Sequence, residues 1–477
     1  MPGRVHTAEE NMPQRIPYLL ASLHLLAGLL LLLNTAQAAG DDRFEDLDTC
    51  VQAELQRTNC PGAVLAVVLG KEVIYTKAYG LANIETGAPM QADMLFLLAS
   101  TTKMFTAAAV VTLAEAGKLK LDAPLSDCVS GLPPGMAKLT LHQALTHSAG
   151  LAATAAYGNV GPQDDSRLGE MLRTQGARFC LWEPGSIYSY SNVGYWLAGL
   201  AIESASGCYY APAVTELILR PLGMTRATFY LAEAKAGPMA HGHGPEGQGP
   251  AKLIPNLDDL YDIAATRPAG KLFCSAPLFA RFCIAFMNDG QLEGKRALSP
   301  YVIQKLSTPY VALPSGGRRT AYGLNVDDRD GVRWLSHGGK LSGYGSTVRM
   351  YPAQRFAVVV LANKTGVQLT RVQDKAAELV LGLRPSPVAV ANQVQPLDAE
   401  EMRRYAGSYV NMRTIELRVQ DGRLVGKEGG RVTKLGANRF RRAASGDAPP
   451  IDFSFVTNSR GEVEYLVQGL YAFKRNP

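Results

Sequence analysis

The order of apolar and polar positions predicts strands at both ends of the first 385 residues and helices between them. The predicted elements are, in order, a helix over 41–58, two strands over 64–80, helices and loops over 100–300, strands within 321–363 and a helix over 368–382. Strands from the two ends would form one antiparallel sheet flanked by helices, and the middle would form an all-helical lobe. The pattern therefore predicts an α+β fold with a groove between sheet and lobe.

The pattern changes after residue 385. Residues 386–396 contain two prolines and no long apolar run, which is typical of a linker. Short alternating runs follow over 397–477, with a hairpin turn at Asp421-Gly422, and predict a small all-β meander or barrel. The main domain would then cover 39–385. The role of the C-terminal domain stays open between a ligand or partner module, a wall of the substrate pocket and simple packing, since a fold does not fix a role.

Residues 1–38 have the pattern of a secretory signal peptide. Arg15 precedes an apolar stretch over 16–33, and Ala36-Gln37-Ala38 is a small-x-small cleavage site. The apolar stretch is also nearly long enough to span a bilayer, so an uncleaved membrane anchor is the alternative. Both interpretations predict that the main domain is exported to a periplasmic or extracellular location.

Composition narrows the class of partner. The chain has 477 residues, 47% hydrophobic and 19% charged, which suits two or three globular units with a large core. The net charge is +6, and the sequence has no basic run long enough to indicate nucleic-acid binding. The positive balance implies at most a weak association with an anionic membrane or cell-wall surface. The sequence does not determine the oligomeric state.

All seven cysteines follow the N-terminal segment, and export permits disulfides. Cys50 could pair with Cys60, although spacing does not fix the pairing and buried free thiols are the other interpretation. The cysteines and His241-Gly242-His243 lack the spacing of a metal site, so we expect neither metal nor cofactor. Residues 237–255, rich in glycine and proline, are a candidate lid over a pocket.

Ser100 and Lys103 are the first candidate catalytic residues. They stand three positions apart at the start of a helix-forming run over 104–117, so their side chains would share one helix face. A serine hydroxyl becomes a nucleophile when a base takes its proton, and a lysine amine can serve as that base. Ser100 is the only serine followed by lysine at the third position. The alternative is a capping serine and a solvated lysine.

Tyr190-Ser191-Asn192 is the second candidate motif. It stands between a Pro-Gly turn and an apolar helical run, where a phenol and an amide could approach the Ser-Lys pair. Other Tyr-x-Asn triplets lack this turn-then-helix setting, so only this copy is a candidate.

His337-Gly338-Gly339 is the third motif, placed after a strand-like run over 332–336. Its two glycines allow a backbone to approach a ligand closely. His337 alone could equally be a structural histidine at the end of a strand. His147, within LTHSAG, is interpreted as a structural loop residue rather than a base.

In this order, Ser-x-x-Lys, Tyr-Ser-Asn and His-Gly-Gly resemble the penicillin-recognising serine hydrolases. Within them the chain is similar to the branch of class C β-lactamases, D,D-carboxypeptidases, D-aminopeptidases and class VIII-type esterases. Stretches such as GLANIETGAPMQADMLFLLASTTK and HGGKLSGYGSTVRMYP extend the resemblance over roughly 44–385. The C-terminal residues resemble the lipocalin-like β domains appended to some members. The resemblance implies a β-lactamase/transpeptidase-like fold.

The resemblance also implies acyl transfer through a serine ester, without a cofactor. The implied roles are nucleophile for Ser100, shared proton handling for Lys103 and Tyr190, orientation of lysine and substrate for Asn192, and substrate binding for His337, Gly338 and Gly339. Backbone amides of Ser100 and of a residue after Gly339 would form the oxyanion hole. Water would then release the acyl group.

Two departures from the family pattern affect this interpretation. Class C β-lactamases usually carry Lys-Thr-Gly where this chain has His-Gly-Gly, which favours a peptidase or esterase acting on a small peptide-like or ester substrate. Pro268-Ala269-Gly270-Lys271 replaces the frequent Pro-Ala-Gly-Gly and puts the local loop in doubt. The alternatives are a β-lactamase and, from another class, a non-catalytic binding protein that keeps the fold. An α/β-hydrolase is disfavoured because Gly-x-Ser-x-Gly is absent from the sequence.

Overall fold

The computed structural model describes Gly3 and residues 44–154, 164–247, 249–255, 263–313, 317–329, 331–383, 394–444 and 450–476. Apart from Gly3, the predicted signal segment lies outside these residues. Within them, none of the helices has both the length and the hydropathy needed to cross a bilayer. The chain divides into two compact units, 1–49 and 50–477, and helix α2 (Glu45–Thr58) runs from the first into the second. The second unit contains every described strand and all the described helices after α2.

A nine-stranded antiparallel sheet joins segments from both ends of the main domain. Its order is β10 (Val311–Ala312), β11 (Arg319–Thr320), β12 (Asn325–Arg329), β13 (Val332–Leu341), β14 (Tyr344–Tyr351), β15 (Phe356–Ala362), β1 (Gly62–Leu69), β2 (Glu72–Asn83) and β3 (Ala88–Pro89). The β1–β15 pairing runs from Ala63↔Ala362 to Leu69↔Phe356. Both strands are apolar runs rich in β-branched residues and are buried along nearly their whole length, as a central strand requires. The predicted meeting of the two ends is therefore present.

Two strand boundaries differ from the sequence-based expectation. His337-Gly338-Gly339 lies inside β13 rather than after it, because Gly339 pairs with Ser346 of β14. The residues before Asn325, predicted as strand, form a turn instead. Gly323 has φ +71°, and a Cβ there would lie 2.8 Å from the Lys103 carbonyl oxygen. The chain must turn where it passes the helix that carries Lys103.

Helices make up most of the middle of the chain, as predicted. They are η2 (Ala99–Thr101), α3 (Thr102–Glu115), η3 (Leu125–Asp127), α4 (Pro134–Ala137), α5 (Leu141–Leu145), α6 (Arg167–Gln175), η4 (Gly176–Phe179), α7 (Asn192–Ser206), α8 (Tyr210–Val214), η5 (Thr215–Leu219), α9 (Leu231–Lys235), η6 (Ala264–Thr266), α11 (Arg267–Gly270), α12 (Ala276–Met287) and α13 (Pro300–Ser307). Short strand pairs lie between them: β4 (Phe96–Leu97) with β7 (Phe273–Cys274), β5 (His243–Gly244) with β6 (Lys252–Leu253), and β8 (Gln291–Leu292) with β9 (Lys295–Arg296).

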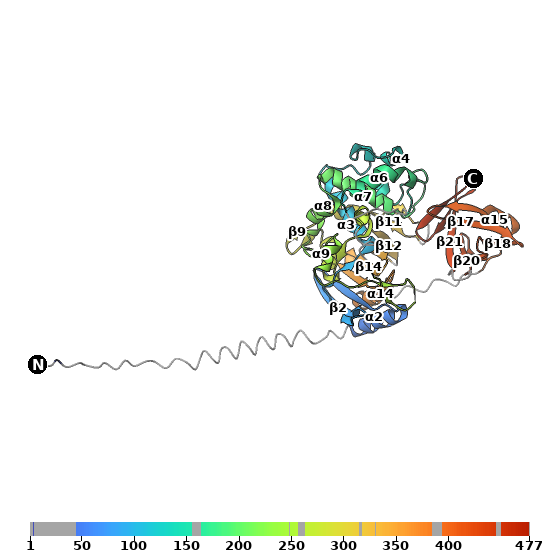
Figure 1. Cartoon of the computed structure of the whole chain (residues 1–477). Helices are drawn as coiled ribbons and strands as arrows, with labels where there is room; N and C mark the ends of the chain where they lie inside the picture. The colour runs from blue at the N-terminus through green and yellow to red at the C-terminus, as the bar shows by residue number, and fades with distance from the viewer. Residues whose placement is uncertain are drawn as a thin grey trace. The chain divides into compact units, whose positions relative to one another are not determined.

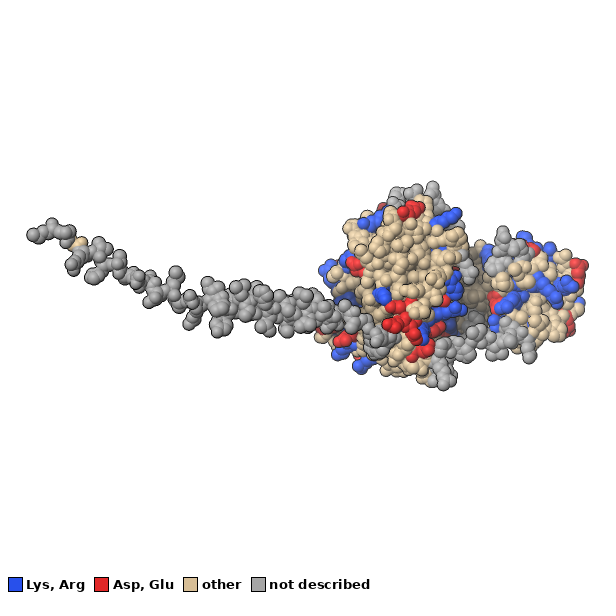
Figure 2. Space-filling view, turned by 90° about the horizontal axis from the view of Figure 1, so that it is seen from below, with Lys and Arg blue, Asp and Glu red and all other residues tan. Residues whose placement is uncertain are grey.

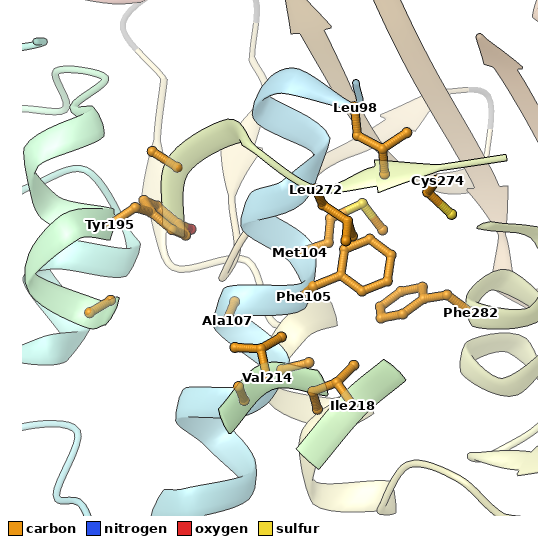
Figure 3. Packing of buried hydrophobic residues seen from close by; sticks show 14 of the residues in the cluster. Leu98, Met104, Phe105, Ala107, Tyr195, Val214, Ile218, Leu272, Cys274 and Phe282 are labelled. Carbon is orange, nitrogen blue, oxygen red and sulfur yellow. The ribbon is translucent and has the colours of Figure 1, made fainter. Parts of the chain in front are cut away.

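Helix α3 lies at the centre of this part and is buried on almost all sides. Figure 1 shows α3 beside α7 and α8, with which it is in contact. Phe105 points from α3 towards Phe282 of α12, with Leu272 and Cys274 close by (Figure 3). The ring centroids of Phe105 and Phe282 are 4.9 Å apart. Burial all round fixes both the position and the rotation of the helix that carries Lys103.

Helix α14 (Thr370–Leu381), which follows β15, covers the face of the sheet that points away from the main core. The short helix η7 (Pro352–Gln354) forms the turn between β14 and β15. Gln373 and Asp374 of α14 bond to Thr347 and Arg349 of β14. Val348, which points to the other face of the same strand, belongs to the main hydrophobic core, on the side where α12 packs against β1, β14 and β15. The sheet therefore lies between two helical layers, as the α+β expectation required.

The C-terminal residues form a nearly closed eight-stranded barrel. Helix α15 (Ala399–Tyr405) precedes β16 (Gly407–Val410), β17 (Thr414–Gln420), β18 (Arg423–Gly426), β19 (Val432–Gly436), β20 (Arg439–Arg442), β21 (Ile451–Thr457), β22 (Val463–Gln468) and β23 (Tyr471–Arg475). The strand order is β18-β17-β16-β23-β22-β21-β20-β19, and a bridge between Val425 and Arg431 brings the two edges together. Its core is aromatic, with Phe455 stacked on Tyr405 at 4.4 Å. Both parts of the predicted fold class are thus confirmed.

All seven cysteines lie in the described residues and all are free thiols, so Cys50 and Cys60 are not joined. Burial raises the pKa of the Cys60 thiol to about 12, which keeps it protonated and unreactive. The densest basic cluster, on β20, is partly neutralised because Arg439 and Arg441 both pair with Asp452. On the face in Figure 2 acidic and basic side chains are intermingled.

Phe105→Ala should lower the free energy of unfolding of the main domain by about 3–5 kcal/mol, because it opens a cavity where a buried ring touches two others. Chemical denaturation followed by circular dichroism would measure this. Leu69→Ala, at a half-exposed strand end, is the control and should cost less than about 1 kcal/mol. Equal losses in the two variants would contradict the central position of Phe105.

Candidate active site

Ser100 lies in a tight turn, η2, directly before α3. The preceding residue, Ala99, has φ +49°, a left-handed conformation that costs energy for a residue with a side chain. The neighbouring strands hold the turn in place. The Ser346 hydroxyl donates to the Leu98 carbonyl at 2.6 Å, and a Cβ on Gly339 would lie only 2.2 Å from the same oxygen. Gly339 is thus required for the close approach of β13 to the Ser100 turn.

Lys103 is buried and points at Ser100. Its Nζ lies 3.3 Å from Ser100 Oγ, 2.7 Å from Asn192 Oδ1 and 2.7 Å from the carbonyl oxygen of Ala269. These three partners are neutral, and no carboxylate of the described residues forms an ion pair with it. Burial therefore lowers the pKa of the Lys103 amine well below its usual value. An uncharged amine beside a hydroxyl is the arrangement that a general base needs.

Tyr190 lies on the other side of the lysine. The centre of its ring is 4.9 Å from Lys103 Nζ, and the ring stacks on that of His147 at 4.3 Å. Its hydroxyl is buried without a hydrogen bond to any described residue. Burial raises the pKa of the Tyr190 phenol above its usual value. The nearby Ser100 hydroxyl, which can stabilise the phenolate, offsets part of that rise. The shifts of Lys103 and Tyr190 both favour the neutral form.

Ser191 and Asn192 begin helix α7. Ser191 is the N-cap, and its side chain accepts a hydrogen bond from the Gly194 amide. Asn192 is the first helical residue, and its backbone amide donates a hydrogen bond to the Ala153 carbonyl oxygen at 2.7 Å. The cap fixes the first turn and so aims the Asn192 side chain at Lys103. The predicted turn-then-helix setting of this motif is present.

His337 belongs to the same site, with its ring centroid 6.4 Å from that of Tyr190. Burial, assisted by Lys103, lowers its pKa to about 3, so the imidazole is neutral at ordinary pH. Nδ1 lies 2.9 Å from the Gly338 carbonyl oxygen, so it carries the hydrogen and donates. Its other ring nitrogen is then an acceptor. Gly338 leaves room for Gln368, whose side chain bonds the carbonyls of Gly339 and Ser346.

Strand β13 leaves a backbone edge available near Ser100. Pairing with β12 ends at Asn325↔Ser336, whereas pairing with β14 continues to Leu341↔Tyr344. Residues 337–341 therefore have no strand partner, among the described residues, on the β12 side. An extended substrate backbone can add to such an edge. The amide of Ser100 and one after Gly339 are the oxyanion donors expected from sequence.

A cavity of about 930 Å³ opens over these residues. Ser100, Tyr190, Asn192 and His337 line it, and so do Leu470 and Tyr471 from the C-terminal barrel. The segment 237–255 was predicted as a lid, but none of its described residues lines this cavity. It packs instead at the end of β15, where His243 bonds to Asn363. The described residues contain no cluster of three or more metal-ligating side chains.

His147 has a larger part in the site than its sequence setting indicated. It adopts φ +58°, is buried, and accepts a hydrogen bond from the Ser191 amide at Nδ1, 3.0 Å away. Together with the stacking on Tyr190, this contact orients the Tyr-Ser-Asn segment. Burial lowers the pKa of His147 well below its usual value, so it is a neutral support for the phenol. The LTHSAG stretch was the available signal for it.

The Ala269 carbonyl was also missed as a partner of Lys103. It belongs to the segment where Lys271 replaces the more frequent glycine, which had put the loop in doubt. The segment forms a short helix, α11, and Thr102 Oγ1 accepts from the Leu272 amide just beyond it. Lys271 itself is buried. The loop thus keeps a shape in which its backbone faces Lys103.

A family model described as Beta-lactamase matches residues 47–382. The chain belongs to the Beta-lactamase family. Protein flp of Staphylococcus aureus (strain MW2) is 24% identical over 365 residues, 74% of this chain and 70% of flp. Esterase EstB of Burkholderia gladioli is 36% identical over 203 residues, 39% of this chain and 52% of EstB. The protein is thus a member of a family of β-lactamase-fold serine hydrolases that includes an esterase.

The crystal structure of SurE superposes with a TM-score of 0.76 at 23% identity, covering 92% of this chain and all of SurE. At that identity the likeness concerns the fold alone. The coverage exceeds the range of the Beta-lactamase match, so the similarity extends to the C-terminal barrel. The predicted β-lactamase/transpeptidase-like fold with an appended β domain is confirmed.

Lys103→Arg should reduce the rate at which a fluorophosphonate labels Ser100 by about 10²–10⁴-fold, because a guanidinium stays protonated and cannot take the hydroxyl proton. The second-order rate constant, measured by intact-protein mass spectrometry between pH 6 and 9, would show it. In the wild type this rate should rise with pH as the amine loses its proton. Lys118→Arg, in the exposed turn that follows α3, is the control. Undiminished labelling of Lys103→Arg would remove Lys103 from the base role.

Proposed function

We propose that this protein is an esterase- or peptidase-type serine hydrolase that forms an acyl-enzyme on Ser100. The observation that carries the proposal is the buried Lys103 amine, 3.3 Å from the Ser100 hydroxyl and without a counter-charge among the described residues. A structural lysine would be solvated or paired with a carboxylate, because burying an unpaired ammonium is costly. A neutral amine directed at a serine instead suits nucleophilic catalysis.

In the first step Ser100 Oγ attacks the substrate carbonyl carbon, and its proton passes to Lys103 Nζ. Asn192 and the Ala269 carbonyl orient the amine by their hydrogen bonds. The carbonyl oxygen takes up the negative charge and is stabilised by the two backbone amides of the oxyanion hole. The product is a tetrahedral intermediate with a protonated lysine beside it.

In the second step the intermediate collapses, the bond to the leaving group breaks, and that group takes a proton. Tyr190 suits this transfer because its raised pKa keeps the phenol protonated. The phenol donates to the leaving atom and recovers a proton from the Lys103 ammonium, so the two residues act as one relay. Water then attacks the ester carbonyl of the acyl-enzyme, with the neutral lysine again as base, and releases the acid.

The substrate proposed is a small ester or peptide-like amide. The free edge of β13 favours an extended backbone, and the partial likeness to EstB favours esters. His337 remains neutral and can accept a hydrogen bond from the substrate beside this strand. β-Lactam hydrolysis is the second candidate, favoured by the family match, and requires rapid deacylation as well as the same acylation.

Intact-protein mass spectrometry on the wild type and on Ser100→Ala tests the proposal. The wild type should gain one fluorophosphonate adduct and hydrolyse p-nitrophenyl acetate, and Ser100→Ala should lose both, with activity lower by on the order of 10³-fold or more. Ser126→Ala, a serine outside the cavity, is the matched control. Absence of labelling and turnover in a folded wild type would leave only a binding role.

The same experiment with a penicillin separates the two catalytic candidates. A stable penicilloyl adduct on Ser100 shows acylation without rapid deacylation and supports the esterase or peptidase assignment. Rapid turnover of a chromogenic cephalosporin, with no adduct accumulating, would replace that assignment by β-lactamase.

A further inference from the structure

The turn between β22 and β23 of the C-terminal barrel reaches the candidate active site. The Tyr190 amide donates to the Leu470 carbonyl at 2.9 Å, so a residue of the barrel bonds directly to the backbone of the candidate proton donor. The Ala472 amide donates to the Ser189 hydroxyl at 3.2 Å. Tyr471 meets the Tyr190 ring edge-on, with centroids 6.1 Å apart. The barrel turn is therefore joined to the Tyr-Ser-Asn motif and the residue before it by direct hydrogen bonds and a ring contact.

An apolar cluster anchors this contact. Trp182 of the main domain packs with Tyr465, Val467 and Ala472 of the barrel, and all four are buried. The centroids of the Trp182 and Tyr465 rings are 5.8 Å apart in an edge-to-face arrangement. Buried aromatic contacts of this kind are those that fix interfaces most firmly. The turn is therefore held in a defined position relative to Tyr190.

Position matters for Tyr190 because its own hydroxyl offers little restraint. The hydroxyl makes no hydrogen bond to a described residue. The orientation of the phenol depends on the backbone bond to Leu470 and on rings packed around it, His147 on one side and Tyr471 on another. Tyr471 thus lies against the Tyr190 phenol, which donates a proton to the leaving atom in the proposed mechanism.

The barrel turn also supplies apolar surface to the cavity. Leu470 and Tyr471 both line it, and they keep 39% and 36% of their surface exposed. Leu313, from the segment before β11, packs on Tyr190 and lines the same cavity. Partly exposed large apolar side chains gathered at one pocket indicate a binding surface for apolar groups.

The cationic side chains that line the cavity are paired with acidic ones, which is compatible with a surface for apolar groups. Arg318 pairs with Asp327, Arg349 pairs with Asp374, and Lys340 lies 3.8 Å from Glu246. Each of these cations has an acidic neighbour. An anionic group on the substrate would therefore have to compete with a carboxylate already in place.

We propose that Leu470 and Tyr471 of the barrel form the wall of a leaving-group subsite beside Tyr190, and that this subsite selects uncharged, apolar leaving groups. The inference rests on the proposed function, since the mechanism places the leaving atom at Tyr190. It assigns the C-terminal barrel a direct part in substrate selection. The substrate class is an ester or amide whose alcohol or amine carries an apolar chain or ring.

The test uses a series of acetate esters with ethyl, butyl and octyl alcohols and measures kcat/KM by acid release. All three form the same acetyl-enzyme, so differences report the alcohol side alone. The wild type should prefer the octyl ester over the ethyl ester, and Tyr471→Ala should reduce this preference by about tenfold, since it removes a large part of the apolar wall. Leu470→Ala, which keeps the carbonyl that accepts from Tyr190, should reduce it in the same direction. Tyr471→Phe should preserve it.

Tyr209→Ala is the matched control, since Tyr209 is half exposed and lies outside the cavity. Thermal unfolding of each variant verifies folding. An unchanged octyl-to-ethyl ratio in folded Tyr471→Ala and Leu470→Ala, with the wild type active, would overturn the subsite alone. An effect confined to esters of different acyl length with one common alcohol would also overturn it. A wild type that neither turns over these esters nor becomes labelled at Ser100 would instead overturn the proposed function.

Discussion

The burial of the Lys103 amine without a counter-charge is the constraint on which the rest of the site depends. Three neutral partners from η2, α7 and α11 surround it, and the adjoining Tyr190 ring excludes water from one side. A carboxylate in place of any of these partners would hold the amine as an ammonium, which cannot act as a base. The arrangement of helices around α3 is thus what gives Ser100 its neighbouring base.

This arrangement costs stability. The pKa of Lys103 is depressed in the folded chain, so between its folded-state and unfolded-state pKa values the unfolded chain binds a proton that the folded chain does not. Unfolding is then favoured by proton uptake, and the penalty shrinks as the pH rises towards the normal lysine value near 10.5. Extensive burial on all sides of α3 offsets the penalty. The left-handed Ala99 is a second local cost beside the same serine.

The sequence predicted those contacts of the candidate site that lie between residues close together in the chain. It missed the contacts that join distant segments. Ser100 and Lys103 are three positions apart across the junction of η2 and α3, and the cap at Ser191 sets Asn192, so local rules placed them. The contact between the Ala269 carbonyl and Lys103 could not be predicted, because every residue has a backbone carbonyl and the residue type does not reveal its partner. Tyr471 meets Tyr190 across 281 positions of the sequence, and a hairpin turn in the barrel carries no local sign of its neighbour. The extent of β13 was set by its pairing with β14, which periodicity alone does not report.

The most direct measurement is the titration of the Lys103 amine itself in the full chain. Lysine labelled with ¹³C at Cε gives an NMR signal whose shift follows the charge of the amine, and the signal absent from Lys103→Met identifies the residue. We expect it to have the shift of a neutral amine at pH 8, with a titration midpoint well below that of the exposed lysines. A Lys103 signal that stays in the charged form up to pH 10 would contradict the account, because the site would then lack its base.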